Sequence, residues 1–181
     1  MSDSQEAFQT LLQLAQHSRA VARGLPAQAD IRPMWSGIGF SLMGQYFVAP
    51  MGEVSEMLEI PSYTHLPGVQ PWVRGVANVR GRLLPLFDMA AFFGDRLSGT
   101  RKQRRVLVLE TSTLYSGLIV DQVFGMQYFP VDEFSEQAGE EVVPDVLPFV
   151  TGSYPLGGRQ WSLFRPALLA EDARFINAAR S

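Results

Sequence analysis

The stretch RGVANVRGRLLPLFDMAAFFG, residues 74–94, decides the fold, because a turn at Arg80-Gly81 separates two apolar runs that each predict a β-strand. Asn78 stands just before the turn. Gly81 can supply the positive φ that a tight turn requires, whereas Asn78 and Arg80 allow three interpretations. They could form only the turn, cradle a phosphate, or present a surface to another protein.

The two runs, residues 73–79 and 82–88, predict a hairpin, and MAAFFG predicts one short helix that ends at Gly94. Pro85 lies inside the second run and lacks the N–H that a sheet ladder requires. We therefore expect the second strand to lie at a sheet edge or to be bulged at Pro85. An edge with an Asn and an Arg beside it suits protein recognition better than core packing.

Short β-runs with Gly and Pro turns also fill most of the remaining chain, as a mainly β fold built from small barrels requires. Residues 38–50 predict two strands around Met43-Gly44-Gln45, and residues 149–164 predict a hairpin around Gly157-Gly158. Residues 105–129 predict a further series of strands. The segment EVSEMLEI, residues 53–60, is compatible with a strand or a helical turn.

The two ends of the chain predict helices. Residues 2–24 place apolar side chains on one helical face, at Phe8, Leu11, Leu12 and Ala15, and residues 25–37 read as a linker. Residues 165–181 predict a C-terminal helix with a proline in its first turn. Because no predicted strand comes from residues 1–24, we expect their deletion to leave the β fold intact.

Composition restricts the class of protein. A chain of 181 residues can bury roughly 70% of its unfolded surface. Its net charge of −3 argues against a dedicated nucleic-acid binder, and the absence of cysteine excludes disulfides, thiolate metal sites and Cys nucleophiles. The acidic N-terminus does not resemble a signal peptide, and no apolar run is long enough to span a membrane, so we expect a cytoplasmic protein without direct membrane insertion.

No pattern of reactive side chains indicates catalysis. His17 and His65 are far apart in sequence, and no phosphate-binding loop, dinucleotide fingerprint or nucleophile elbow is present. The neighbouring Glu140 and Glu141 have no apolar shelter that would raise a carboxyl pKa. We therefore expect no enzyme activity, no catalytic residue, no cofactor and no metal site.

Two charged segments remain. RKQRR, residues 101–105, could be a solvated loop between barrels, a contact for an acidic partner protein, or the groove of a nucleic-acid-binding barrel. No aromatic residue is interleaved with it for base stacking, which weighs against nucleic acid. Residues 132–147 are acidic and lack Lys and Arg, so with few apolar anchors we expect this segment to be mobile.

The motif GVANVRGRLLPLFDMAAFFG resembles the signature of the CheW family, in which a Gly-Val-x-Asn-Leu-Arg-Gly turn precedes an apolar-Pro-apolar-apolar-Asp strand and a closing Phe-Gly. FSLMGQYFVAPMGEVSEML is similar to the family's first hairpin and its Val-x-Glu-Ile segment, with Val54 and Glu56 at the matching places. RVLVLE and YSGLIVDQVFGM are similar to the first strands of the second barrel. The resemblance covers roughly residues 38–170.

The resemblance implies two packed five-stranded SH3-like β-barrels, barrel one at about 38–94 and barrel two at about 105–164, without enzymatic activity. It further implies a cytoplasmic adaptor that couples the regulatory domain of a CheA-type histidine kinase to the cytoplasmic tips of methyl-accepting chemoreceptors in membrane arrays. The N-terminal helix and Trp35 and Trp72 are similar to family members that serve type IV pilus twitching motility.

Partner contacts are also implied by the resemblance alone. Four positions, Val54, Gly75, Val106 and Leu107, correspond to the receptor side, and Leu83 corresponds to the kinase side.

The resemblance implies that Arg80 and Glu56 support the surface that the hairpin presents to its partners, and Asn78 beside them is a further candidate protein-binding residue. Glu56 belongs to a neighbouring segment of the same expected barrel, so we expect its carboxylate to pair with the Arg80 guanidinium and to fix the turn.

Overall fold

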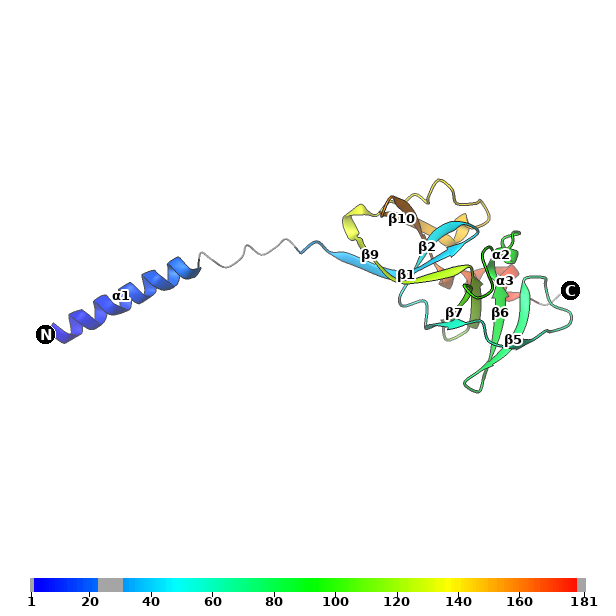
Figure 1. The fold of residues 1–181 in the computed structure, drawn as a ribbon, viewed down its shortest axis with the longest axis horizontal. Helices are drawn as coiled ribbons and strands as arrows, with labels where there is room; N and C mark the ends of the chain where they lie inside the picture. The colour runs from blue at the N-terminus through cyan, green and yellow to red at the C-terminus, as the bar shows by residue number, and fades with distance from the viewer. Residues whose placement is uncertain (1, 23–30, 179–181) are drawn as a thin grey trace. The chain divides into compact units, whose positions relative to one another are not determined.

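The computed structural model describes residues 2–22 and 31–178, which belong to two compact units, Met1–Arg32 and Pro33–Ser181. Helix α1 (Ser2–Ala22) belongs to the first unit and confirms the expected N-terminal helix (Figure 1). The side chains of Phe8, Leu11 and Leu14 are all more than half exposed on this helix. The expected end of this helix, at residue 24, lies outside the described residues.

The second unit contains two curved β-sheets, which confirms the expected mainly β fold (Figure 1). A five-stranded sheet has the order β10-β11-β2-β1-β9 and comprises β1 (Met34–Leu42), β2 (Gln45–Pro50), β9 (Gln122–Pro130), β10 (Val150–Leu156) and β11 (Arg159–Phe164). A six-stranded sheet has the order β3-β7-β8-β6-β5-β4 and comprises β3 (Glu56–Glu59), β4 (Tyr63–Thr64), β5 (Val73–Val79), β6 (Arg82–Asp88), β7 (Arg105–Glu110) and β8 (Tyr115–Val120).

Neither sheet is built from one continuous segment, so the sheets do not follow the expected division into residues 38–94 and 105–164. The β1–β2 hairpin pairs with β9 and, in parallel, with β11. The later hairpin β7–β8 pairs with β3 and, in parallel, with β6. Parallel strands cannot be joined by a tight turn, so these pairings bring together strands that are far apart in the chain. The five-stranded sheet thus combines the early β1–β2 hairpin with later strands, and the six-stranded sheet combines the later β7–β8 hairpin with earlier strands.

Each sheet encloses its own core, and a third core is shared between the two sheets. Aliphatic residues fill the six-stranded sheet: Ala77, Leu84, Leu86, Val106, Val108 and Ile119. Larger side chains fill the five-stranded sheet: Val48, Phe129, Tyr154 and Trp161. The shared core is rich in phenylalanine and includes Phe40, Phe47, Phe87, Phe92, Phe93, Phe149, Phe164 and Phe175.

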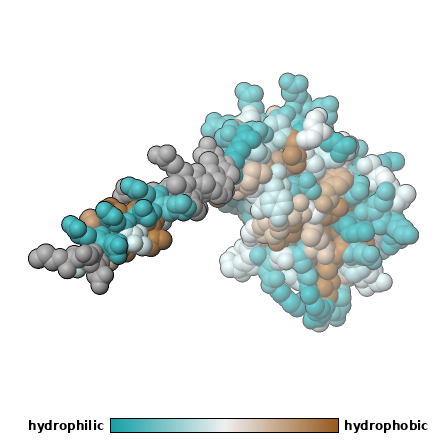
Figure 2. All heavy atoms as spheres, turned by 60° about the vertical axis from the view of Figure 1, so that its left-hand side comes forward, coloured by the Kyte–Doolittle hydropathy of each residue, from teal (hydrophilic) through white to brown (hydrophobic). Residues whose placement is uncertain are grey.

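The surface of the second unit is mixed. Hydrophilic residues cover much of the face drawn in Figure 2, and apolar residues reach that surface in a band. No helix among the described residues has the length and apolar character needed to cross a bilayer.

The hairpin predicted from residues 73–79 and 82–88 is confirmed as β5 and β6, and the short helix after it is α2 (Met89–Phe92). The buried Asp88 begins this helix, because its carboxylate accepts the N–H of Ala91 at 2.9 Å and also pairs with the Arg74 guanidinium. Neither expected alternative for β6, a sheet edge or a bulge at Pro85, is observed. This strand lies between β5 and β8, and Pro85 is tolerated because pairing with β8 starts only at Leu86.

The expected single C-terminal helix is also corrected. Its described part consists of the 3-10 helix η3 (Pro166–Glu171) and one turn of α-helix, α3 (Ala173–Ile176). The Asp172 carboxylate accepts the N–H groups of Arg174 and Phe175, so a new helix starts there instead of continuing the first. This break allows Leu169 and Phe175 to enter the shared core.

The acidic segment 132–147 has more anchors than the sequence suggests. Val146 is fully buried, and the Gly139 N–H donates to Ser162 Oγ at 3.2 Å. An isolated bridge joins Ser135 to Ser153 of β10. Val142 and Val143 also pack against the shared core, so the expectation of few apolar anchors is wrong, while the mobility of the segment stays a prediction. Two 3-10 helices, η1 (Val131–Glu133) and η2 (Leu147–Phe149), flank the segment.

Deletion of residues 1–24 should leave the second unit folded, because its cores consist of residues from the second unit alone. We expect the truncated protein to unfold cooperatively with a thermal midpoint within about 2 °C of the full chain. Phe40→Ala is the control for damage to the core, and it should lower the free energy of unfolding by about 3–5 kcal/mol. Loss of cooperative unfolding in the truncated protein would show that the helix belongs to the core.

Candidate protein-binding surface

The turn between β5 and β6 has an uncommon backbone. Arg80 has φ 51° and Gly81 has φ 81°, so both central residues adopt positive φ, as in a type I′ turn. The Asn78 side chain completes the turn, because its Oδ1 accepts the Gly81 N–H at 2.9 Å. Asn78 is exposed, so this bond accounts for its place in the motif without a buried polar group.

Arginine is a poor choice for this position, since Asn, Asp and Gly tolerate positive φ better. Among the described non-glycine residues, only Met43 shares this conformation, with φ 53°. Met43 packs against the shared core, which explains its presence. The Arg80 side chain is 71% exposed and has no such packing. Its presence therefore reflects what its guanidinium contacts.

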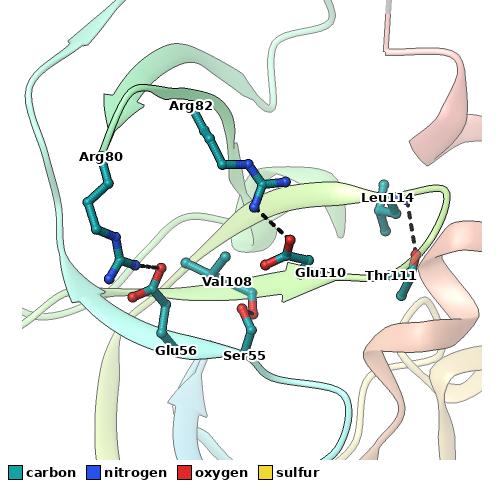
Figure 3. A network of polar contacts seen from close by, with 8 residues as sticks. All are labelled: Ser55, Glu56, Arg80, Arg82, Val108, Glu110, Thr111 and Leu114. Atoms are coloured by element: carbon teal, nitrogen blue, oxygen red, sulfur yellow. Dashed lines mark hydrogen bonds and ion pairs between the residues drawn. The ribbon is translucent and has the colours of Figure 1, made fainter.

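That contact is Glu56, at the start of β3, whose Oε1 accepts a hydrogen bond from Arg80 Nη2 (Figure 3). The predicted ion pair is thus confirmed. The hydrogen bond from Arg80 to the Glu56 carboxylate, reinforced by the carboxylate charge, raises the pKa of Arg80, which stays protonated at any physiological pH. The pair joins edge strand β3 to the hairpin, although β7 and β8 lie between β3 and β6 in the sheet order.

A second ion pair runs beside the first and was not predicted. Arg82 Nη1 donates to Glu110 Oε1 at 2.6 Å (Figure 3). The Arg82 guanidinium also lies 3.8 Å from the centre of the Tyr115 ring. In the sequence Arg82 is seen only to lie close to Arg80, and nothing there identifies its partner. The partners of Arg82 follow from the sheet order, which brings the end of β7 and the start of β8 next to β6.

The outer face of the hairpin is partly apolar. Leu83 is 69% exposed and pairs in register with Asn78, and half-buried Pro85 pairs with half-buried Val76. Because side chains alternate along a strand, these four share one face, while Leu84 points into the enclosed core. We call this face, together with the Arg80–Glu56 pair, the hairpin surface.

Four of the expected contact positions do not reach this surface. Val54 and Leu107 are buried in the shared core, and Val106 is buried inside the six-stranded sheet. Gly75 is buried too, with φ 150°, and a Cβ added there would lie 2.2 Å from the carbonyl oxygen of Thr64. The side chains of Val54, Val106 and Leu107 are thus hardly exposed, and Gly75 has no side chain.

The described residues contain no group of three or more His, Asp or Glu side chains that could hold a metal ion. The hairpin surface combines fixed charge, an exposed leucine and a turn held by its own side chains. These features suit the recognition of another protein.

Comparison with known proteins gives a consistent result. The model of the CheW-like domain family matches residues 36–174. The chain is 52% identical to the protein PilI of Pseudomonas aeruginosa over 179 residues, 99% of each chain. It is 29% identical to the protein FrzA of Myxococcus xanthus over 75% of this chain and 73% of FrzA. The crystal structure of the scaffolding protein TtCheW from Thermoanaerobacter tengcongensis shares the fold, with a TM-score of 0.63 and 23% identity over 73% of this chain and 89% of that chain.

Gly75→Ala should destabilise the protein, because the new methyl group would overlap the Thr64 carbonyl at a backbone conformation that L-residues rarely adopt. We expect a loss of about 1–3 kcal/mol in urea unfolding. Gly52→Ala is the matched control, since nothing lies within 4 Å of its added Cβ. Equal free energies of unfolding for the two variants would show that β4 and β5 can move apart at Gly75 without loss of stability.

Proposed function

Because the chain belongs to the CheW-like family, we propose that it is an adaptor that couples a CheA-type histidine kinase to methyl-accepting chemoreceptors. The family consists of non-catalytic scaffolds, and the similarity to PilI supports a place in the chemosensory signalling that controls type IV pilus twitching motility. In this role the chain acts in the cytoplasm and reaches the membrane only through its partners.

The observation that carries the proposal is the Arg80 conformation. Arg80 has positive φ and an unpacked side chain, in a turn position that suits Asn better. This combination indicates a function for Arg80 beyond the fold. Its partner Glu56 holds the guanidinium over the outer end of the six-stranded sheet (Figure 3). The turn is thereby fixed in advance, which lowers the entropy that a partner must remove on binding.

We assign Leu83 to the kinase contact, beside the fixed turn. An exposed leucine on a rigid hairpin can fill an apolar pocket on a partner, while charged residues around it set orientation. Val76 and Pro85 extend the apolar face toward the middle of the hairpin.

The four buried positions fit the proposal in a different way from the one expected. Val54, Val106 and Leu107 hold β3 and β7 against the cores, and Gly75 allows β4 to approach β5 closely. We propose that they shape the receptor side of the molecule from beneath and do not contact the receptor.

Arg80→Asn separates folding from binding. Asparagine suits the turn conformation, so we expect the thermal midpoint to stay equal or rise, while complex formation with purified CheA-type kinase and receptor weakens about tenfold or more. Arg174→Ala is the control, because it removes a similarly exposed guanidinium, one that pairs with Asp172. Unchanged complex formation by Arg80→Asn would reduce Arg80 to a turn residue.

Leu83→Glu tests the kinase side. Since Leu83 is 69% exposed, its replacement should change the free energy of unfolding by less than about 0.5 kcal/mol. Kinase binding should be lost while receptor binding is retained, as measured by pull-down with each partner separately. Ile176→Glu, at a residue that is 60% exposed on α3, is the matched control. Equal loss of both partners would contradict a kinase-specific contact.

A further inference from the structure

The connection between α2 and β7 contains four cations, Arg96, Arg101, Lys102 and Arg104, and a fifth, Arg105, begins β7. Within the described part of the chain, none of them forms an ion pair with a carboxylate. Five arginines elsewhere in the second unit each pair with a carboxylate. Arg159 is a further described arginine of the second unit without a carboxylate partner, and its guanidinium lies 4.2 Å from the centre of the Tyr46 ring. The unpaired cations are therefore concentrated at this connection.

The basic connection is ordered by its own backbone. Thr100 bonds to the Gln103 side chain, and Arg105 Nη1 donates to the carbonyl oxygens of Lys102 and Arg104, both at 2.8 Å. Arg104 Nη2 donates to the Leu97 carbonyl oxygen at 3.3 Å. Two guanidinium groups are thus held in place without their charge being neutralised.

Four of these five cations line a hollow of about 390 Å³ beside the end of β3. Arg101, Lys102, Arg104 and Arg105 line it together with Glu59, which pairs in register with Arg105, and the apolar Ile60. Four cations face one carboxylate, so the hollow is strongly positive. Arg104 Nε is buried and has no hydrogen-bond partner among the described residues.

We propose that this hollow binds an acidic segment of a partner protein, with carboxylates on the cations and one apolar side chain against Ile60. Charge complementarity carries the proposal, and the apolar wall favours a peptide over a pure polyanion. No aromatic side chain lines the hollow for base stacking, and the net charge of −3 repels nucleic acid at long range. The site is separate from the hairpin surface and does not depend on the proposed function.

The probe is a fluorescein-labelled octapeptide of six glutamates around two central leucines, measured by fluorescence anisotropy with the full chain. We expect binding at about 50 mM NaCl that weakens steeply by about 300 mM, because exposed charges are then screened. Arg101→Glu and Lys102→Glu should each weaken binding about tenfold. Arg159→Glu makes the same charge change at an exposed cation of the β10–β11 hairpin and should stay within about twofold of wild type.

Several results would overturn the proposal. These are absence of peptide binding at low salt, equal weakening by Arg159→Glu, and tighter binding of a single-stranded DNA octamer than of the peptide. Salt-sensitive self-association of the protein that Arg101→Glu abolishes would replace the proposed partner with the acidic segment 132–147 of a second copy. Arg101 and Lys102 are exposed, so unchanged thermal unfolding of their variants establishes that a binding loss is local.

Discussion

The aromatic core between the two sheets is the feature on which the rest of the structure depends. Trp72, Phe87 and Phe175 meet there from different parts of the chain, with ring centres 4.7 to 6.0 Å apart. Rings of Phe40, Phe47 and Phe164 extend the same core into the five-stranded sheet. Because each sheet borrows a hairpin from the other half of the chain, neither sheet is complete until both halves are present. Such non-local pairing couples the two sheets into one folding unit.

Two buried carboxylates tie this core to the loops around it. Asp88 ends β6, begins α2 and pairs with Arg74, so the inner end of the β5–β6 hairpin is fixed. Asp121 accepts the Met43 N–H at 2.9 Å and fixes the turn of the β1–β2 hairpin between the two sheets. The opposite end of the β5–β6 hairpin carries the turn at Arg80. A hairpin anchored at one end and locked by an ion pair at the other can present Leu83 in one orientation.

Local sequence signals predicted what depends on neighbouring residues, and failed where distant pairing decides. The bounds of β5 and β6 followed from alternation and the Arg-Gly turn. The Arg80–Glu56 pair joins residues that are distant in sequence, and it was predicted only because the family resemblance places Glu56 on a neighbouring segment of the same barrel. The exchange of hairpins did not follow, because no local pattern states which strand pairs in parallel with β6 or β2. The same gap explains why β6 was expected at an edge and why the Arg82–Glu110 pair was missed. Val54, Val106 and Leu107 are apolar, so burial is their ordinary state, and it was the family resemblance alone that assigned them to a partner contact.

The two proposed contact regions lie at opposite ends of one edge strand and differ in physical character. Glu56 at the start of β3 is neutralised by Arg80, and Glu59 at its end faces the unpaired cations of the basic connection. The neutralised Arg80–Glu56 pair attracts a partner little at long range but fixes the geometry of the turn. It therefore affects the rate at which a complex dissociates and the choice of partner. Unpaired cations on a protein of net negative charge act at a distance, so they accelerate encounter with an acidic partner and are screened by salt. Placing both on β3 lets one edge of the sheet attract a partner through one end and orient it through the other.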